Sequence, residues 1–150
     1  MGGLKSAVEE LSLADHMLYV TFPLLNDKQI FLNAVNHLGK SITEVIRAFM
    51  SREVAFKRIK FMPPKDLLIN EFIDRYSGNL GLNKRLVKMI KQVTTFNNVR
   101  HRSSIKLKRN DKFIVISPEY SMSALTLEEA KDYLRLAREF VQKMRGQMDE

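Results

Sequence analysis

The 150-residue sequence contains no cysteine and no tryptophan. Without cysteine, the chain forms no disulfide, holds no zinc or iron–sulfur cluster through thiolates and has no cysteine nucleophile. It also lacks any apolar run approaching the ~20 residues that span a bilayer, and residues 1–5 do not begin a secretory signal peptide. These absences predict a cytoplasmic protein that is not integrated into a membrane.

Motifs of the common enzyme classes are missing as well. The one glycine-containing loop of note, Gly78–Gly81, lacks the Gly-Lys-Ser/Thr that completes a phosphate-binding loop. No two of the three histidines are three or four residues apart, and neither Glu-x-x-His nor His-Glu-x-x-His occurs. The sequence therefore predicts neither a metal site nor a bound cofactor.

Positive charge is what the sequence has in excess. The net charge is +8, and residues 84–112 hold ten cations and a single anion, so the rest of the chain sums to −1. A solvated surface normally mixes the two signs, and we expect this segment to form one basic surface that binds phosphates. The candidate binding residues are Lys84, Arg85, Lys88, Lys91, Arg100, Arg102, Lys106, Lys108, Arg109 and Lys112.

Apolar spacing predicts a mainly α fold in a single domain, residues 1–150. The first helical stripe runs to Phe22, and Pro23 should kink or end that helix. Asp27 is suited to cap a second helix of about 33 residues that reaches Ile59. A third helix should begin at Pro64.

The C-terminal half adds a hairpin between two helices. The fourth helix should begin near Leu82 and fray at residues 97–98, and the alternating segments 105–108 and 113–116 predict a hairpin that turns at Asn110-Asp111. Thr126 and Glu129 have the spacing of a capping box for a last helix. The sequence therefore predicts a mostly antiparallel bundle of five helices that is similar to a four-helix bundle, with one β-hairpin inserted before the last helix. Gly146 should end the last helix. Lys106, Lys108 and Lys112 should share the exposed face of the hairpin.

His101 is the single candidate catalytic residue. Arg100 and Arg102 flank it in the sequence. A histidine between two guanidiniums combines a proton-transfer group with groups that bind a phosphate, and these are the minimum groups needed to cleave RNA without a metal ion. Neighbouring cations should also lower the histidine pKa. The alternative interpretation is an ordinary polar loop within a basic face.

The predicted order of elements resembles the HEPN superfamily of small helical bundles, through its long second helix, the basic loop after the fourth helix and the capped last helix. The resemblance implies a dimeric RNase or RNA-binding protein. Residues 14–25 are also similar to the start of small archaeal helical proteins with no assigned activity. In HEPN nucleases an Arg precedes the catalytic His, with four to six residues between them. In this sequence the corresponding positions before His101 are Thr94, Thr95 and Phe96, so the Arg is missing. The resemblance therefore implies binding rather than cleavage.

Our leading hypothesis is a non-enzymatic module that binds RNA or another polyanion through the basic surface and forms a homodimer through a helix face. The first alternative is a metal-independent RNase that uses His101. The second is an interaction module whose basic face docks an acidic protein partner.

Overall fold

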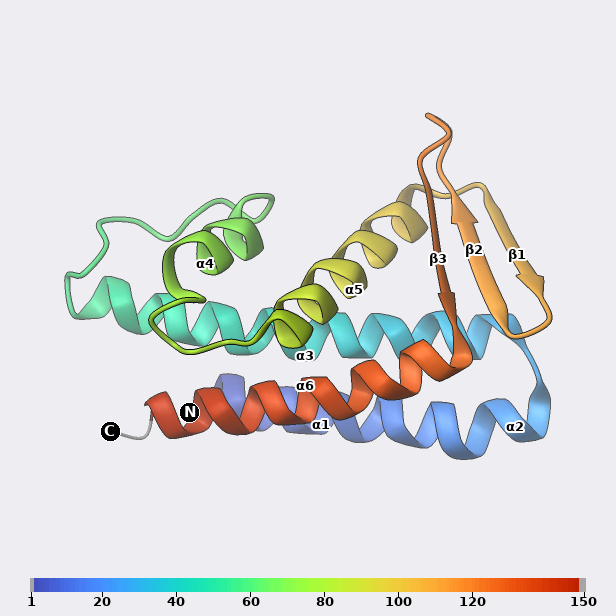
Figure 1. Cartoon of the computed structure of the whole chain (residues 1–150), viewed down its shortest axis with the longest axis horizontal. Coiled ribbons are helices and arrows are strands. Elements are labelled where there is room, and N and C mark those ends of the chain that lie inside the picture. The colour runs from blue at the N-terminus through green and yellow to red at the C-terminus, as the bar shows by residue number, and fades with distance from the viewer. Residues whose placement is uncertain (1, 149–150) are drawn as a thin grey trace.

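Helices make up most of the structure, a computed structural model that describes residues 2–148 (Figure 1). The helical elements are α1 (Gly2–His16), the π-helical segment η1 (Met17–Thr21), α2 (Phe22–Leu25), α3 (Lys28–Ala55), α4 (Leu68–Tyr76), α5 (Lys84–Arg102) and α6 (Leu127–Met148). The strands β1 (Ile105–Arg109), β2 (Lys112–Ile116) and β3 (Met122–Thr126) form one antiparallel sheet in that order. Because α1, η1 and α2 make one helical run, the described residues contain five helices, and the predicted mainly α fold is confirmed.

Pro23 does not end the first helical run, which continues to Leu25. A proline inside a helix lacks an N–H group, and its ring crowds the carbonyl group four residues back. Here the preceding turn is widened to π-helical geometry, in which the Phe22 N–H bonds the Met17 carbonyl five residues back. The run ends after Leu25, where Asn26 forms the C-cap with a left-handed backbone and φ of 51°.

α3 is the central helix and packs against α1, α4, α5 and α6 (Figure 1). Asp27 caps it as predicted, because the Asp27 carboxylate accepts a hydrogen bond from the Gln29 N–H at 2.9 Å. The helix ends at Ala55 and not at Ile59, since Lys57 turns the chain away through a left-handed backbone with φ of 61°. Its 28 residues span about 42 Å.

Two other helix boundaries also differ from the prediction. α4 begins at Leu68 and not at Pro64. α5 does not fray at Asn97 and Asn98 but continues to Arg102. The side chain of Asn97 is buried and hydrogen-bonds a backbone carbonyl of α3, so tertiary packing holds this residue in the helix despite its low helical propensity.

The capping box at the start of α6 is confirmed. The Thr126 N–H donates to Glu129 Oε1 at 2.8 Å, and the Glu129 N–H donates to Thr126 Oγ1 at 3.0 Å. α6 then runs through Gly146, the predicted end, to Met148. A single glycine costs a helix only about 1 kcal/mol, and here it does not end one.

The predicted hairpin of β1 and β2 is confirmed, with Asn110 and Asp111 at its turn. The sequence does not predict β3, because Ser123 and Ala124 weaken the apolar alternation of this segment. β3 nevertheless pairs with β2 along its whole length. The sheet stands at one end of the helices (Figure 1).

Aromatic rings attach the inner face of the sheet to the helices. Phe113 of β2 stacks on Phe31 of α3, with ring centroids 3.7 Å apart and planes 7° from parallel. Phe22 meets Phe113 edge-on at 5.6 Å. All three rings belong to one cluster of buried side chains that extends through the helices.

Candidate nucleic-acid interface

Three lysines of α5 form an exposed row, and we call Lys84, Lys88 and Lys91 the stripe lysines. Their spacing of four and three residues places them on one face of the helix, while the opposite face is buried in the core. Asn83 starts the helix, because its side-chain oxygen accepts a hydrogen bond from the Leu86 N–H at 2.9 Å. Lys84 therefore stands in the first turn, where unpaired N–H groups already favour anions.

A groove follows the stripe lysines through two connected hollows. The first has a volume of about 530 Å³, and its lining includes Ser77, Lys84, Lys88, Lys91 and Gln92. The second has a volume of about 360 Å³ and lies between α5 and β3; its lining includes Lys91, Gln92, Thr95 and residues 122–125. Because the hollows share Lys91 and Gln92, they form one feature, which we call the α5 groove.

The stripe lysines form no ion pair within residues 2–148. Two other predicted cations of α5 do have acidic neighbours. Arg85 lies 3.7 Å from the Asp132 carboxylate of α6, and Arg102 lies 2.5 Å from the Glu119 carboxylate. Among the exposed lysines and arginines of α5, those without an ion pair within residues 2–148 are therefore the stripe lysines, which line the α5 groove.

Arg100 turns toward α3 instead of joining that surface. Its Nη2 donates a hydrogen bond to Asn33 Oδ1 at 3.1 Å, and its Nε is buried with no hydrogen-bond partner within residues 2–148. A guanidinium held in this way connects α5 to α3. It is not presented to an external phosphate.

The expected common face of Lys106, Lys108 and Lys112 is wrong. The two-residue turn pairs Arg109 with Lys112, whereas Lys108 opposes the buried Phe113. Side chains alternate between the two faces of a sheet, so Lys106 and Lys108 belong to the inner face at the edge strand, and Arg109 and Lys112 belong to the outer face. The hairpin therefore divides its cations between two sides.

His101 lies in the last turn of α5, near cations from several segments. Partial burial lowers the pKa of His101 below its ordinary value of 6.5, and the positive charges of Arg100, Lys65, Lys106 and Lys40 lower it further. The His101 imidazole is therefore predominantly neutral at pH 7, in the direction predicted from the neighbouring cations.

The polar groups next to His101 in the sequence are engaged elsewhere. Arg100 and Arg102 are hydrogen-bonded to other side chains, and neighbouring helix positions project about 100° apart, so the two guanidiniums diverge from His101. The Ser103 hydroxyl is hydrogen-bonded to the backbone of β1 and β2. The structure thus does not bring these side chains together around one reacting atom.

We expect His101 to titrate below pH 6.5 in a pH series of NMR spectra, and Lys65→Ala and Lys106→Ala should each raise its midpoint. Because the folded-state pKa lies below the unfolded one, this histidine's contribution to stability is present above pH 6.5 and is lost as pH falls through the folded pKa. His101→Asn should accordingly reduce the fall in the free energy of unfolding between pH 7 and pH 5. A midpoint at or above 6.5 in the folded protein would contradict this account.

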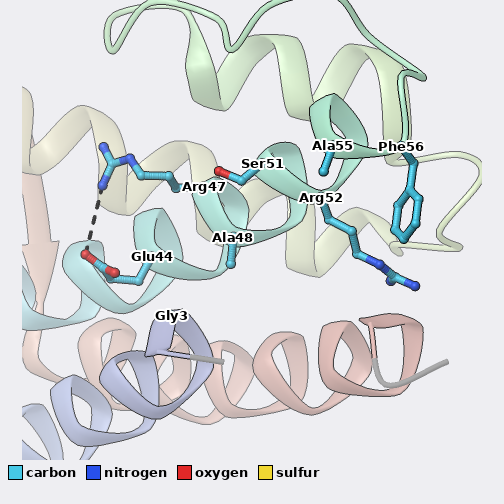
Figure 2. A pocket seen from close by; sticks show the side chains of 8 residues that line it. All are labelled: Gly3, Glu44, Arg47, Ala48, Ser51, Arg52, Ala55 and Phe56. Carbon is cyan, nitrogen blue, oxygen red and sulfur yellow. Dashed lines mark ion pairs between the residues drawn. The ribbon is translucent and has the colours of Figure 1, made fainter.

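A separate hollow of about 570 Å³ lies beside the C-terminal half of α3 and contains two arginines (Figure 2). Arg47 is 3.9 Å from the Glu44 carboxylate. Arg52 donates to the Gln147 carbonyl at 2.8 Å and lies 5.5 Å from the ring centre of Phe56. Both arginines already interact with the protein, so the α5 groove is the stronger candidate for an anion.

No helix within residues 2–148 is long and apolar enough to cross a membrane. The same part of the chain contains no group of three or more histidine, aspartate or glutamate residues that could hold a metal ion. Comparison with known protein families, curated proteins and solved structures gives no match to this chain. The functional argument therefore rests on the α5 groove itself.

Proposed function

We propose that this protein binds RNA, or another polyanion built on a phosphate backbone, in the α5 groove. The observation that carries the proposal is the row of stripe lysines in a groove where they form no ion pair within residues 2–148. A net charge of +8 supports it, because excess positive charge attracts polyanions over distances beyond direct contact.

The dimensions of the lysine row suit one nucleic-acid strand. Lys84 and Lys91 are seven positions apart, which corresponds to about 10 Å along the helix axis. A stacked strand advances about 3.4 Å per phosphate, so about three phosphates occupy the same length. Each stripe lysine can then meet one phosphate.

The groove lining favours recognition of the backbone over recognition of bases. The residues that line its two hollows include no aromatic side chain on which a base could stack. Ser77, Gln92 and Thr95 offer neutral groups that hydrogen-bond phosphate or ribose oxygens. We therefore expect binding that tolerates many base sequences and weakens with salt.

Fluorescence anisotropy with a labelled single-stranded RNA tests the proposal. With three phosphates neutralised, the logarithm of the association constant should fall against the logarithm of salt concentration with a slope of roughly −2. The triple variant Lys84→Gln, Lys88→Gln and Lys91→Gln should weaken binding about tenfold or more at low salt and flatten this slope.

A matched control removes the same charge elsewhere. Lys5, Lys57 and Lys60 are exposed and form no ion pair within residues 2–148, so their triple substitution by Gln should preserve most of the affinity. Equal losses in the two triple variants would show that net charge, and not the α5 groove, binds the polyanion. Single-stranded DNA and heparin in parallel identify which polyanion is preferred.

The same samples separate the alternative functions. Under the proposal the RNA remains intact after long incubation. Cleavage that persists in chelator and disappears in His101→Ala would overturn the binding role in favour of an RNase. Copurification of one acidic protein, with no RNA binding at low salt, would instead identify the basic face as a protein-docking surface.

A further inference from the structure

The outer face of the sheet is apolar where an antiparallel sheet usually presents polar side chains to water. Its side chains form three rows across the strands: Ile105, Ile116 and Met122; Leu107, Ile114 and Ala124; Arg109, Lys112 and Thr126. Ile105 and Leu107 are each 45% exposed and Met122 is 68% exposed. Two adjacent apolar rows therefore lie uncovered beside one basic row.

We infer that the outer face of this sheet packs against the same face of a second copy of the chain. The inference does not rest on the proposed RNA binding, because the β1 and β2 residues of the outer face do not line the α5 groove; Met122 and Ala124 of β3 stand at the border of both surfaces. Adjacent exposed apolar side chains on a small protein commonly mark an interaction surface.

The edges of the sheet favour face-to-face contact over strand addition. At the β1 edge, Lys28 Nζ donates a hydrogen bond to the Lys106 carbonyl at 2.7 Å and so occupies a group that a new strand would need. At the opposite edge, β3 lies against α5. A second sheet stacked on the outer face, at the usual separation of about 10 Å, meets neither obstacle.

The row order is self-complementary about one two-fold axis. If the axis runs perpendicular to the strands and passes between the two apolar rows, each apolar row covers an apolar row of the other copy. The basic row then lies over the β2–β3 loop (residues 117–121) of that copy. This loop follows the row of Ile105, Ile116 and Met122, on the side away from the basic row. An axis parallel to the strands would instead place the basic row of one copy over the basic row of the other.

The β2–β3 loop carries groups that suit this position. Glu119 remains 59% exposed beside Arg102, so its carboxylate is accessible to Lys112 of the second copy. Tyr120 is 88% exposed and has a left-handed backbone with φ of 67°, an uncommon conformation for an aromatic residue. The Tyr120 ring can also cover the ammonium group of Lys112 of the second copy.

The small area of the patch predicts a weak dimer. Three strands of five residues cover roughly 14 by 17 Å, well below the roughly 800 Å² that each partner buries in a stable interface of standard size. We expect a dissociation constant on the order of 10 μM, so the equilibrium should be visible across an ordinary range of protein concentrations.

Sedimentation velocity between about 1 and 200 μM tests the inference. Wild-type protein should shift from monomer to dimer, and Leu107→Glu should remain monomeric. Leu13→Glu is the matched control, because Leu13 of α1 is 47% exposed and receives the same substitution on a helix face. Circular dichroism establishes that both variants fold, since neither side chain is buried.

Charge exchange tests the two-fold arrangement itself. Glu119→Lys and Lys112→Glu should each weaken the homodimer, because each places like charges together at two symmetry-related contacts. An equimolar mixture of the two variants should dimerise again, since both contacts in the mixed dimer then join opposite charges. Failure of the mixture to dimerise would overturn this register.

Three results would overturn the inference as a whole. Wild-type protein that remains monomeric at 200 μM would exclude a second copy of the chain as the partner of the outer face. If that monomer sedimented with vesicles of 30% phosphatidylserine, the partner would be an anionic membrane. A dimer lost in Leu13→Glu but retained in Leu107→Glu would move the contact to a helix face, that of α1. A dimer retained in both variants would place it elsewhere.

Discussion

Phe113→Ala is expected to lower the free energy of unfolding by about 3–5 kcal/mol, the range for truncating a fully buried phenylalanine. Phe113 is 1% exposed, stacks on Phe31 and meets Phe22 edge-on. A small sheet is marginal without helical support, so this loss should also release the strands. Urea unfolding measures the first effect, and faster hydrogen exchange in residues 105–126 than in α3 measures the second.

Leu107→Ala is the control for Phe113→Ala, measured at a protein concentration low enough to keep the chain monomeric. Leu107 occupies the opposite face of the sheet and is 45% exposed, so its truncation should cost less than about 1 kcal/mol. If Phe113→Ala prevents folding altogether, Phe113→Leu should still fold with a smaller loss. If Phe113→Ala and Leu107→Ala lowered the free energy of unfolding equally, the inner face of the sheet would not be the face that attaches to α3.

Gly39→Ala is expected to destabilise the protein by about 2–3 kcal/mol, although alanine normally strengthens a helix. A Cβ atom at Gly39 of α3 would lie 2.3 Å from Asn97 Nδ2 of α5. Asn97 is buried, and Nδ2 donates to the Val35 carbonyl at 3.0 Å, so the amide can move only by giving up this hydrogen bond. Overpacking adds to that loss.

Gly146→Ala is the matched control, because Gly146 is also helical but has open space around the position of a Cβ atom. The same substitution should there raise stability by about 0.5–1 kcal/mol. The double variant Gly39→Ala, Asn97→Ala should recover part of the loss, since it removes the clashing amide. A stabilising Gly39→Ala in urea unfolding would show that α3 and α5 do not approach as closely as described.

Features set within one turn of the chain follow well from the sequence. The Asp27 cap and the box of Thr126 and Glu129 each depend on residues two or three positions apart, and both are confirmed. The π-helical turn before Pro23 and the strand β3 do not follow from local pattern. The first accommodates a missing N–H group and the second forms by pairing with β2, so both depend on hydrogen bonds that residue type does not reveal.

The candidate site divides in the same way. Helical spacing alone places the stripe lysines on one face of α5, but the α5 groove also needs β3, which the sequence does not predict. The resemblance to HEPN proteins stays a prediction, because no comparison bears on it. The apolar outer face of the sheet does not follow from the sequence, because both sets of alternating positions in the hairpin contain apolar residues.

By itself, the sequence determined the order of the helices, the hairpin turn and the concentration of positive charge in residues 84–112, since each depends on composition or short-range spacing. Only the tertiary structure decided which of those charges remain available. Arg100 is held by Asn33, which lies 67 positions away, and Arg102 by Glu119, while Lys84, Lys88 and Lys91 form no ion pair within the described residues. The reason is physical: the burial and pairing of a charge depend on neighbours in space, which distant parts of the chain supply.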